Sequence, residues 1–268
     1  MNALYRAMQT SKQNVHQRMR HQMSQMEMEE QLMLIVQQIR KDHPGMGERA
    51  LYQKIRPDWG RDRFYAWYRN NGLRVKPQKN WRRTTDSSGV IRFDNLTIGL
   101  ELTGVNQLWV SDITYYEIDD TFYYLTYIMD QYSRKIKGYS TSCSLKTRDT
   151  TIPALLMAMR TLPPKSNTIF HSDGGGQYYS HSFLRLTAGR FTNSMGKSAY
   201  ENPYAERLNG IIKNNYLKYY NPKDFKQLRS MNTRAVRMYN DDKPHQAING
   251  LTPTQFEKML TIQSVNYL

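Results

Sequence analysis

The distribution of apolar positions changes character near residue 100 of this 268-residue chain. Before that point, apolar residues recur every three or four positions, which is the period of an amphipathic helix. From residue 106 they fall into short β-branched and aromatic runs, which are typical of strands. The pattern therefore predicts an all-α first part and an α/β second part, in a chain long enough for one sizeable core and a smaller domain.

The first 42 residues are predicted to contain separate helices. Thr10 and Ser11 offer an N-cap for a helix rich in glutamine and basic residues, which fits either a DNA-recognition helix or a glutamine-rich interaction helix. A clearer amphipathic helix is predicted over residues 27–41, and Pro44 with Gly45 should stop it.

Two further short helices are predicted near residues 51–55 and 62–68, separated by glycine-containing turns. Three short helices with basic faces indicate a helix-turn-helix arrangement. Phe64 and Trp67 should pack inward. The candidates for contact with DNA on the last helix are Arg61, Arg63 and Arg69.

A basic segment follows, and it is interpreted as an extended arm along DNA phosphates or in a minor groove. A solvated linker is the alternative. Its candidate DNA-binding residues are Lys76, Lys79, Arg82 and Arg83.

Four strands are predicted in the second part, over residues 108–118, 121–129, 135–142 and 168–170, with a short fifth near 191–193. Helices are expected from about 147 to 162, around 182–187, and after Asn202. Asn202 is a good N-cap, and Pro203 suits the first helical position. Three antiparallel strands, a helix and a further strand follow the order of a ribonuclease-H-like fold with a mixed five-stranded sheet.

The charge balance indicates a polyanionic partner. The formal net charge is +15, and residues 1–100 contain 18 Lys and Arg against 9 Asp and Glu. Nucleic acid is the partner that this excess favours. Cys143 is alone, so no disulfide can form within the chain and a reducing compartment is expected; a small packed residue is its expected role. No apolar run is long enough to span a membrane, so we expect a cytoplasmic protein that does not contact membranes.

Three acidic residues stand out by their settings. Asp112 lies inside the first strand, Asp173 follows the fourth strand and precedes three glycines, and Glu206 lies in the first turns of a helix. Carboxylates that hold a pair of hard cations drive in-line chemistry at phosphodiesters. On the same helix, Asn209 and Lys213 share the face of Glu206, with Tyr216 or Leu217 as a possible extension, and Lys213 could reach a DNA phosphate.

Weaker candidates surround these acids. Asp130 ends the second strand, where a turn-shaping role is favoured. His171 and Ser172 precede Asp173, where they either orient the reacting groups or are simply packed and hydrogen-bonded.

These segments resemble the Asp-Asp-Glu core of transposases of the insertion-sequence-three family, whose catalytic domain is similar to retroviral integrase. The matching segments are 109–115, 171–178 and 201–210; residues 239–240, 244–245 and 251–253 resemble the family's closing signature, and 42–47 with 60–64 its helix-turn-helix. Two departures are visible. Only 32 residues separate Asp173 from Glu206, slightly fewer than is usual, and Glu201 stands where the family commonly has Asp.

The resemblance implies a DNA transposase that binds the ends of its element and catalyses Mg²⁺-dependent cleavage and strand transfer. Asp112, Asp173 and Glu206 would be the catalytic residues and the ligands of two Mg²⁺ ions, for which Mn²⁺ would substitute. The implied partners are the terminal repeats and target DNA, further copies of the chain, and an upstream OrfA-type partner or fusion. The first and fourth strands should lie side by side, bringing Asp112 to Asp173.

The expected organisation has five regions: a helical DNA-binding segment over 1–25, a helix-turn-helix domain over 26–75, a basic linker over 76–103, an integrase-like core over 104–220 and a helical region over 221–268. The competing interpretations are a catalytically inactive DNA-binding regulator and a nuclease of the ribonuclease H type, which normally lacks so long a basic helical half.

Overall fold

The computed structural model describes residues 10–75, 93–164, 166–196 and 201–265, and the basic residues Lys76, Lys79, Arg82 and Arg83 lie outside these ranges. The chain forms two compact units, Met1–Pro44 and Gly45–Leu268. No helix in the described ranges is long and apolar enough to cross a membrane.

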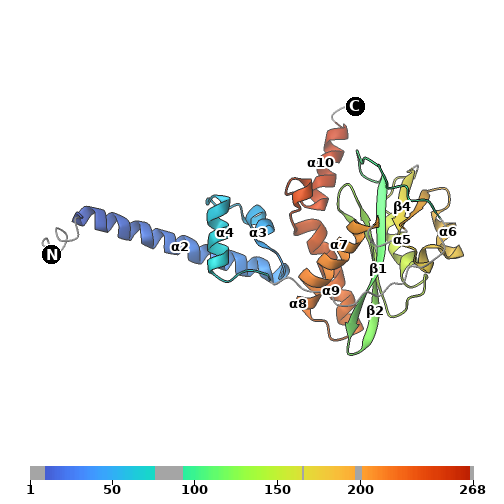
Figure 1. The fold of residues 1–268 in the computed structure, drawn as a ribbon, viewed down its shortest axis with the longest axis horizontal. Helices are drawn as coiled ribbons and strands as arrows, with labels where there is room; N and C mark the ends of the chain where they lie inside the picture. The colour runs from blue at the N-terminus through green and yellow to red at the C-terminus, as the bar shows by residue number, and fades with distance from the viewer. Residues whose placement is uncertain (1–9, 76–92, 165, 197–200, 266–268) are drawn as a thin grey trace. The chain divides into compact units, whose positions relative to one another are not determined.

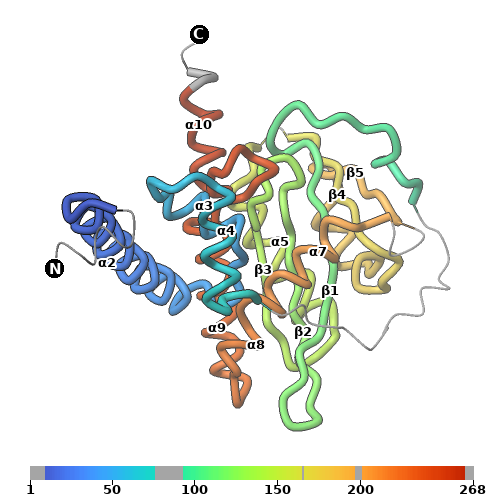
Figure 2. Tube along the Cα trace, turned by 60° about the vertical axis from the view of Figure 1, so that its left-hand side comes forward, coloured from blue at the N-terminus to red at the C-terminus, as the bar shows by residue number. Residues whose placement is uncertain are grey.

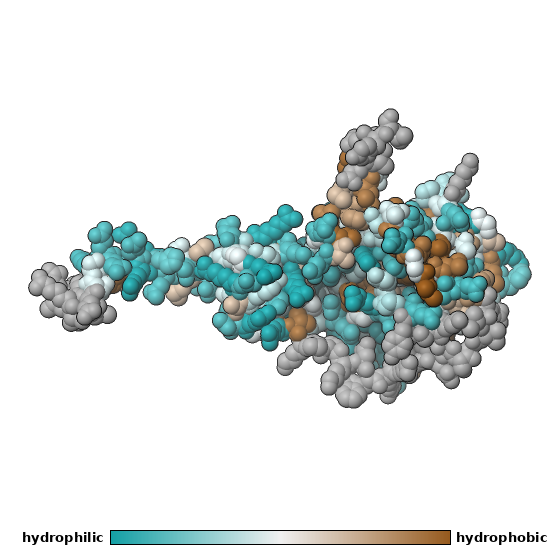
Figure 3. Space-filling view, turned by 45° about the horizontal axis from the view of Figure 1, so that its top comes forward, coloured by the Kyte–Doolittle hydropathy of each residue, from teal (hydrophilic) through white to brown (hydrophobic). Residues whose placement is uncertain are grey.

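The described part of the first unit, from residue 10 on, contains one long helix, α2 (Lys12–Asp42). Ser11 caps it as expected, because its hydroxyl accepts a hydrogen bond of 3.1 Å from the amide of Asn14. The prediction of separate helices on either side of residue 25 was wrong. No proline or glycine interrupts the sequence between Ser11 and Pro44, so a change in polarity alone does not break the helix. On the face shown in Figure 3 the surface of α2 is mainly hydrophilic.

Helices α3 (Glu48–Ile55) and α4 (Arg61–Asn70) confirm the two short helices predicted before residue 75. Each begins directly after a glycine, Gly47 or Gly60. Phe64 and Trp67 are buried, and their ring centroids are 5.7 Å apart. These two side chains therefore form the inward face of α4, as their spacing predicted.

The second unit is built on a five-stranded mixed sheet with the order β3-β2-β1-β4-β5. The strands are β1 (Leu108–Ile118), β2 (Thr121–Asp130), β3 (Ile136–Ser142), β4 (Thr168–Ser172) and β5 (Phe191–Met195). The first three are antiparallel, whereas β4 pairs in parallel with β1 and with β5. This is the predicted ribonuclease-H-like order, and β1 lies at its centre, beside β4 (Figures 1 and 2).

Helices cover both faces of the sheet. On one face, α7 (Pro203–Ile212) and α9 (Phe225–Arg237) enclose a core that includes Val110, Leu208 and Leu228. On the other face, α5 (Thr151–Met159) and α6 (His181–Thr187) enclose a core around Trp109 and Phe170. Alternate residues of β1 thus serve opposite cores, as the pleat of a strand requires.

The crossing of α5 over β3 depends on Gly138. A Cβ atom at this position would overlap the carbonyl oxygen of Ala154 and crowd the backbone of Ala158. Because only glycine leaves this space, α5 can lie directly on β3 and close the second core. Helix α5 ends at Met159, earlier than predicted, and Leu162 remains buried beyond it.

The chain after α7 is helical, and two π-helical turns interrupt it. The first, Lys213–Leu217, leads into α8 (Lys218–Tyr220), and the second, Met238–Asp242, follows α9. The last helix is α10 (Pro253–Val265). Helix α3 is tied to this part by Lys54, whose ammonium lies 2.6 Å from the carboxylate of Asp242. Cys143, expected to be packed, is exposed and lies directly after the end of β3.

Candidate active site

The parallel pairing of β1 with β4 brings two of the three acids together. Ser111 of β1 is in register with Ser172 of β4, and it is the last pair between these strands. Asp112 follows Ser111 within β1, and Asp173 follows Ser172 just beyond the end of β4, so the two acids lie at the same level of neighbouring strands about 5 Å apart. The expected adjacency of the first and fourth strands is confirmed, although 60 residues separate the two acids in sequence.

The third acid, Glu206, lies in the first turns of α7, the helix that packs on β1. Its negative charge raises the pKa of Asp112, which places the two carboxylates in each other's field. Glu206 is exposed, whereas Asp112 and Asp173 are half-buried. The acids thus form an inner pair with a third carboxylate at the surface.

The surroundings of the pair disfavour the charged form of both acids. Burial, and after it the charge of Asp173, raises the pKa of Asp112 to about 7. Burial also raises the pKa of Asp173. A cluster of carboxylates that holds protons this strongly favours a cation between them, since a cation would supply the missing positive charge.

The oxygen donors of these three side chains are the type that Mg²⁺ prefers. Within the described ranges, however, no group of three His, Cys, Asp or Glu side chains is close enough to complete a metal site. The chemistry of the donors fits a hard cation, although the three carboxylates do not form a closed site.

Hydrogen bonds fix the orientation of both inner carboxylates. Asn209 donates from its side-chain amide to Asp112 at 2.7 Å, and the backbone amide of Gly175 donates to Asp173 at 3.2 Å. The hydroxyl of Tyr179 donates to the backbone carbonyl of Asp173 at 2.8 Å. Asn209 was expected to contact DNA, but it is 5% exposed and its amide is directed to Asp112.

Three residues whose part in the site was not predicted from the sequence support it through hydrogen bonds. Ser111 donates its hydroxyl to the carbonyl of Tyr127 at 2.9 Å and lies 2.9 Å from the hydroxyl of Tyr178. Asn202 donates its side-chain amide to the carbonyl of Ser111 at 2.9 Å. Asn202 holds the N-cap position of α7 without a side-chain capping bond, so its amide attaches the helix to β1 instead.

Lys213 begins the first π-helical turn and lies next to β1. Its ammonium is 3.5 Å from the carbonyl oxygen of Tyr115 and 5.1 Å from the centroid of that ring. Burial lowers the pKa of Lys213, and the charge of Asp112 acts in the opposite direction. The π-helical turn changes the phase of the helix, so Tyr216 and Leu217 are buried in the core and do not extend the face of Glu206.

The neighbouring polar residues have structural partners. His171 contacts the hydroxyl of Ser194 at 2.9 Å and the carbonyl of Glu201 at 3.1 Å, which favours the packed alternative. The carboxylate of Asp130 accepts from the amides of Tyr132 and Ser133, so it shapes the turn after β2, as predicted. The carboxylate of Glu201 accepts a 2.6 Å hydrogen bond from Asn95.

The three arginines of α4 differ in their surroundings. Arg61 pairs with its neighbour Asp62 at 3.1 Å, and the guanidinium of Arg63 lies 4.2 Å from the ring centroid of Trp59. Arg69 donates two hydrogen bonds to Glu48, which links α4 to α3. Arg69 therefore already has a structural role.

The sequence matches the family described as "Integrase core domain" twice, over residues 103–191 and 190–253. Asp112 and Asp173 lie within the first match and Glu206 within the second. It is similar to "Insertion element IS600 uncharacterized 31 kDa protein" of Shigella sonnei, with 30% identity over 210 residues, which are 74% of this chain and 75% of that protein.

Other relatives carry transposase names. "Transposase InsF for insertion sequence IS3A" of Escherichia coli K12 is 29% identical over 72% of this chain and 68% of its own length. "Transposase for insertion sequence element IS629" of Shigella sonnei is 28% identical over 67% of this chain, and the match spans 61% of its length. Among solved structures, the HTLV-2 integrase catalytic core domain in complex with magnesium aligns with 25% identity and a TM-score of 0.46, over 56% of this chain and 95% of that one.

Proposed function

Because this chain belongs to the insertion-sequence-three family of transposases, which share the integrase core domain, we propose that it cuts and joins DNA at the ends of its insertion element. The proposed catalytic residues are Asp112, Asp173 and Glu206. The observation that carries the proposal is the Ser111–Ser172 register, which sets two carboxylates side by side under the helix that carries the third.

The three carboxylates would hold two Mg²⁺ ions, or Mn²⁺ in their place. Bound there, the ions would activate a water or a 3′-hydroxyl and stabilise the leaving oxygen of the phosphodiester. Asp112 must be deprotonated to act as a ligand, and without metal its pKa is about 7, so a proton competes with the metal ion for this carboxylate near neutrality.

Other side chains would position these groups. Asn209 keeps the Asp112 carboxylate oriented, and its hydrogen bond favours the ionised form. The amide of Gly175 does the same for Asp173. Lys213, beside Tyr115, would contact the phosphate next to the scissile bond, where its charge offsets that of the strand being joined.

DNA binding away from the carboxylates is proposed for Arg61 and Arg63 on α4 and for Lys76, Lys79, Arg82 and Arg83 of the basic segment. The net charge of +15 supports strong phosphate contacts. Assembly of several copies on DNA, an OrfA-type partner or fusion, and the five-region organisation remain predictions from the family resemblance.

The test is a cleavage and joining assay with the full-length protein and a labelled duplex that ends in the element's terminal repeat. We expect nicked and joined products with Mg²⁺ or Mn²⁺ and none with EDTA. Sequence-specific binding without any products in either metal would instead support the inactive-regulator interpretation.

A further inference from the structure

A second group of charged residues, separate from the three carboxylates, lies where the turn after β2 approaches the chain after the second π-helical turn. It contains two cations, Arg134 and Lys243. In the described ranges of the chain, neither forms an ion pair with a carboxylate. The positive charges of Arg134 and Lys243 thus have no carboxylate partner within these ranges.

Arg134 is held in a fixed position at the base of α7. Its backbone has a φ of 64°, in the left-handed region, so the turn sets the direction of its side chain. The guanidinium lies 4.3 Å from the ring centroid of Tyr204, which is two residues before Glu206. The stacking orders the arginine and leaves its hydrogen-bond donors for a ligand.

Lys243 lies in a largely buried setting. Its ammonium is 3.5 Å from the carbonyl oxygen of Pro244 and 6.0 Å from the ring centroid of Tyr239. Burial lowers the pKa of Lys243 to about 8, and no carboxylate acts against this effect. At neutral pH the lysine is still mostly charged, and a charge buried without a partner is costly.

The side chain of His245 lies within reach of the charges of both Arg134 and Lys243. Its ring centroid is 4.6 Å from that of Tyr239. Burial lowers the pKa of His245 to about 3, and the positive charges of Lys243 and Arg134 contribute to the shift. Both cations are therefore close enough to act on the same imidazole, which stays neutral.

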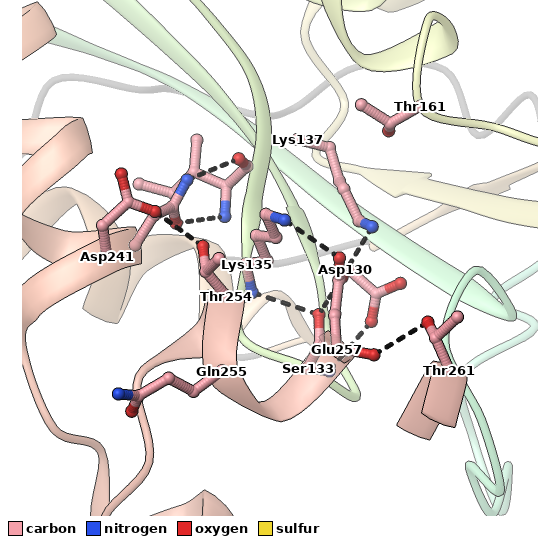
Figure 4. Close-up of polar contacts among 12 residues, drawn as sticks. Asp130, Ser133, Lys135, Lys137, Thr161, Asp241, Thr254, Gln255, Glu257 and Thr261 are labelled. Carbon is pink, nitrogen blue, oxygen red and sulfur yellow. Dashed lines mark hydrogen bonds and ion pairs between the residues drawn. The ribbon is translucent and has the colours of Figure 1, made fainter. Parts of the chain in front are cut away.

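Two acids of the neighbouring segments already have other partners, as Figure 4 shows. Glu257 of α10 accepts from Lys137 at 2.6 Å and from Lys135 at 3.1 Å, and also from the hydroxyl of Ser133. Asp241 accepts a 2.7 Å hydrogen bond from Thr254. Asp242, the neighbour of Lys243 in sequence, pairs with Lys54 at 2.6 Å, so none of these three acids forms an ion pair with Arg134 or Lys243.

We propose that Arg134 and Lys243 together bind a phosphate group of the DNA backbone, at a site distinct from the three carboxylates. The inference rests on the proposed function, because it takes DNA as the source of the phosphate. A guanidinium with an ammonium is a strong donor set for a phosphate oxygen. Since Arg134 stacks on Tyr204 at the start of α7, a phosphate held there fixes the DNA relative to the helix that carries Glu206.

The test measures DNA affinity without catalysis. The full-length protein carries Asp112→Asn and is kept in EDTA, and its binding to a labelled terminal-repeat duplex and to an unrelated duplex is measured over a salt series. Lys243→Met and Arg134→Met should each weaken binding to both duplexes, about tenfold at moderate salt. Each should also reduce the slope of log affinity against log salt by about 0.9.

Two controls separate this role from a structural one. Lys226→Met, at an exposed position on α9, should leave the slope unchanged. Without DNA, Lys243→Met should keep or raise the midpoint of thermal unfolding, because it removes an unpaired, largely buried charge. Inorganic phosphate, compared with chloride at equal ionic strength, should raise the midpoint of the parent and not of Lys243→Met.

The proposal is overturned if Lys243→Met and Arg134→Met both keep the parental salt slope. It is also overturned if inorganic phosphate stabilises the parent while neither substitution changes DNA binding. The latter result would assign the site to a free phosphate. This binding experiment contains neither metal nor the Asp112 carboxylate, so its result does not depend on catalysis. Failure of the parent protein to cleave DNA in the separate assay with metal would overturn the proposed function and leave the binding result unchanged.

Discussion

The side-chain amide of Asn209 donates a 2.7 Å hydrogen bond to the carboxylate of Asp112, and so joins the helix that carries Glu206 to the central strand of the sheet. This bond lowers the pKa of Asp112, against the larger effects of burial and of Asp173. Asn209 is thus a positioning residue whose effect should appear in the pH dependence of the reaction.

Replacing Asn209 should shift the pH profile of the reaction to higher pH. In Asn209→Ala the ionised form of Asp112 loses a donor, so its pKa rises and less of the carboxylate is available at pH 7. We expect DNA cleavage to fall at pH 7 and to recover partly by pH 8.5, as measured by initial rates across pH. Asn167→Ala, at an exposed position before β4, is the control and should leave the profile in place. An unshifted profile in Asn209→Ala would contradict the role.

The stability of the protein should depend on the charge of Asp112. Its pKa is 3.8 for an ordinary aspartate and about 7 in the fold, so between these values the unfolded chain releases a proton that the folded chain keeps. Stability is therefore lost as pH rises through this window. Without divalent metal, Asp112→Asn should be more stable than the parent by about 1–3 kcal/mol at pH 8 and by much less at pH 4.

Urea unfolding at the two pH values measures this difference. If Asp112→Asn raises the free energy of unfolding equally at pH 4 and pH 8, the pKa of the Asp112 carboxyl is not raised in the folded protein. Addition of Mg²⁺ at pH 8 should stabilise the parent and not the variant, since bound cations shift the folding equilibrium toward the native state.

The sequence predicted the acids and their strands more fully than their surroundings. The alternation in residues 108–129 and the acidic turn at Asp119 and Asp120 were sufficient to give β1, β2 and their pairing. What brings Asp173 to Asp112 is a parallel pairing between distant segments, and only the family resemblance suggested it.

Other features could not be predicted because they depend on tertiary contacts. Asn202 has the composition of an N-cap, but packing against β1 directs its amide to Ser111. The π-helical turn at Lys213 has no sequence signal, and it buries Tyr216 and Leu217. Cys143 follows the end of β3, and its exposure depends on the fold of the segment after the strand.

Lys213 should matter more for joining than for affinity. Lys213→Ala should slow joining of the element end by about 10-fold or more, the effect of losing one charge-assisted contact to phosphate, and Lys213→Glu should be more severe. Lys223→Ala, at an exposed position, serves as the matched control. Single-turnover joining rates and duplex affinity are the two measurements. Parental joining by Lys213→Glu would show that the residue is only a helix charge.

The ion pair between α10 and β3 should contribute to stability. The side chain of Lys137 is 4% exposed and lies 2.6 Å from Glu257. Glu257→Gln leaves this buried charge without its partner, which should cost about 3 kcal/mol or more in the free energy of unfolding. Lys135→Met removes a more exposed partner of the same carboxylate and should cost less than about 1 kcal/mol. Equal losses in urea unfolding would contradict the ranking.

The measurement that tests the central claim most directly compares Glu206→Gln with Glu201→Gln in the cleavage and joining assay with Mg²⁺. The negative charge of Glu206 raises the pKa of Asp112, whereas the carboxylate of Glu201 accepts a hydrogen bond from Asn95. We expect Glu206→Gln, like Asp112→Asn and Asp173→Asn, to bind the element end and yield no products, and Glu201→Gln to remain active. A cleaving Glu206→Gln protein beside an inactive Glu201→Gln protein would contradict the assignment of the third carboxylate.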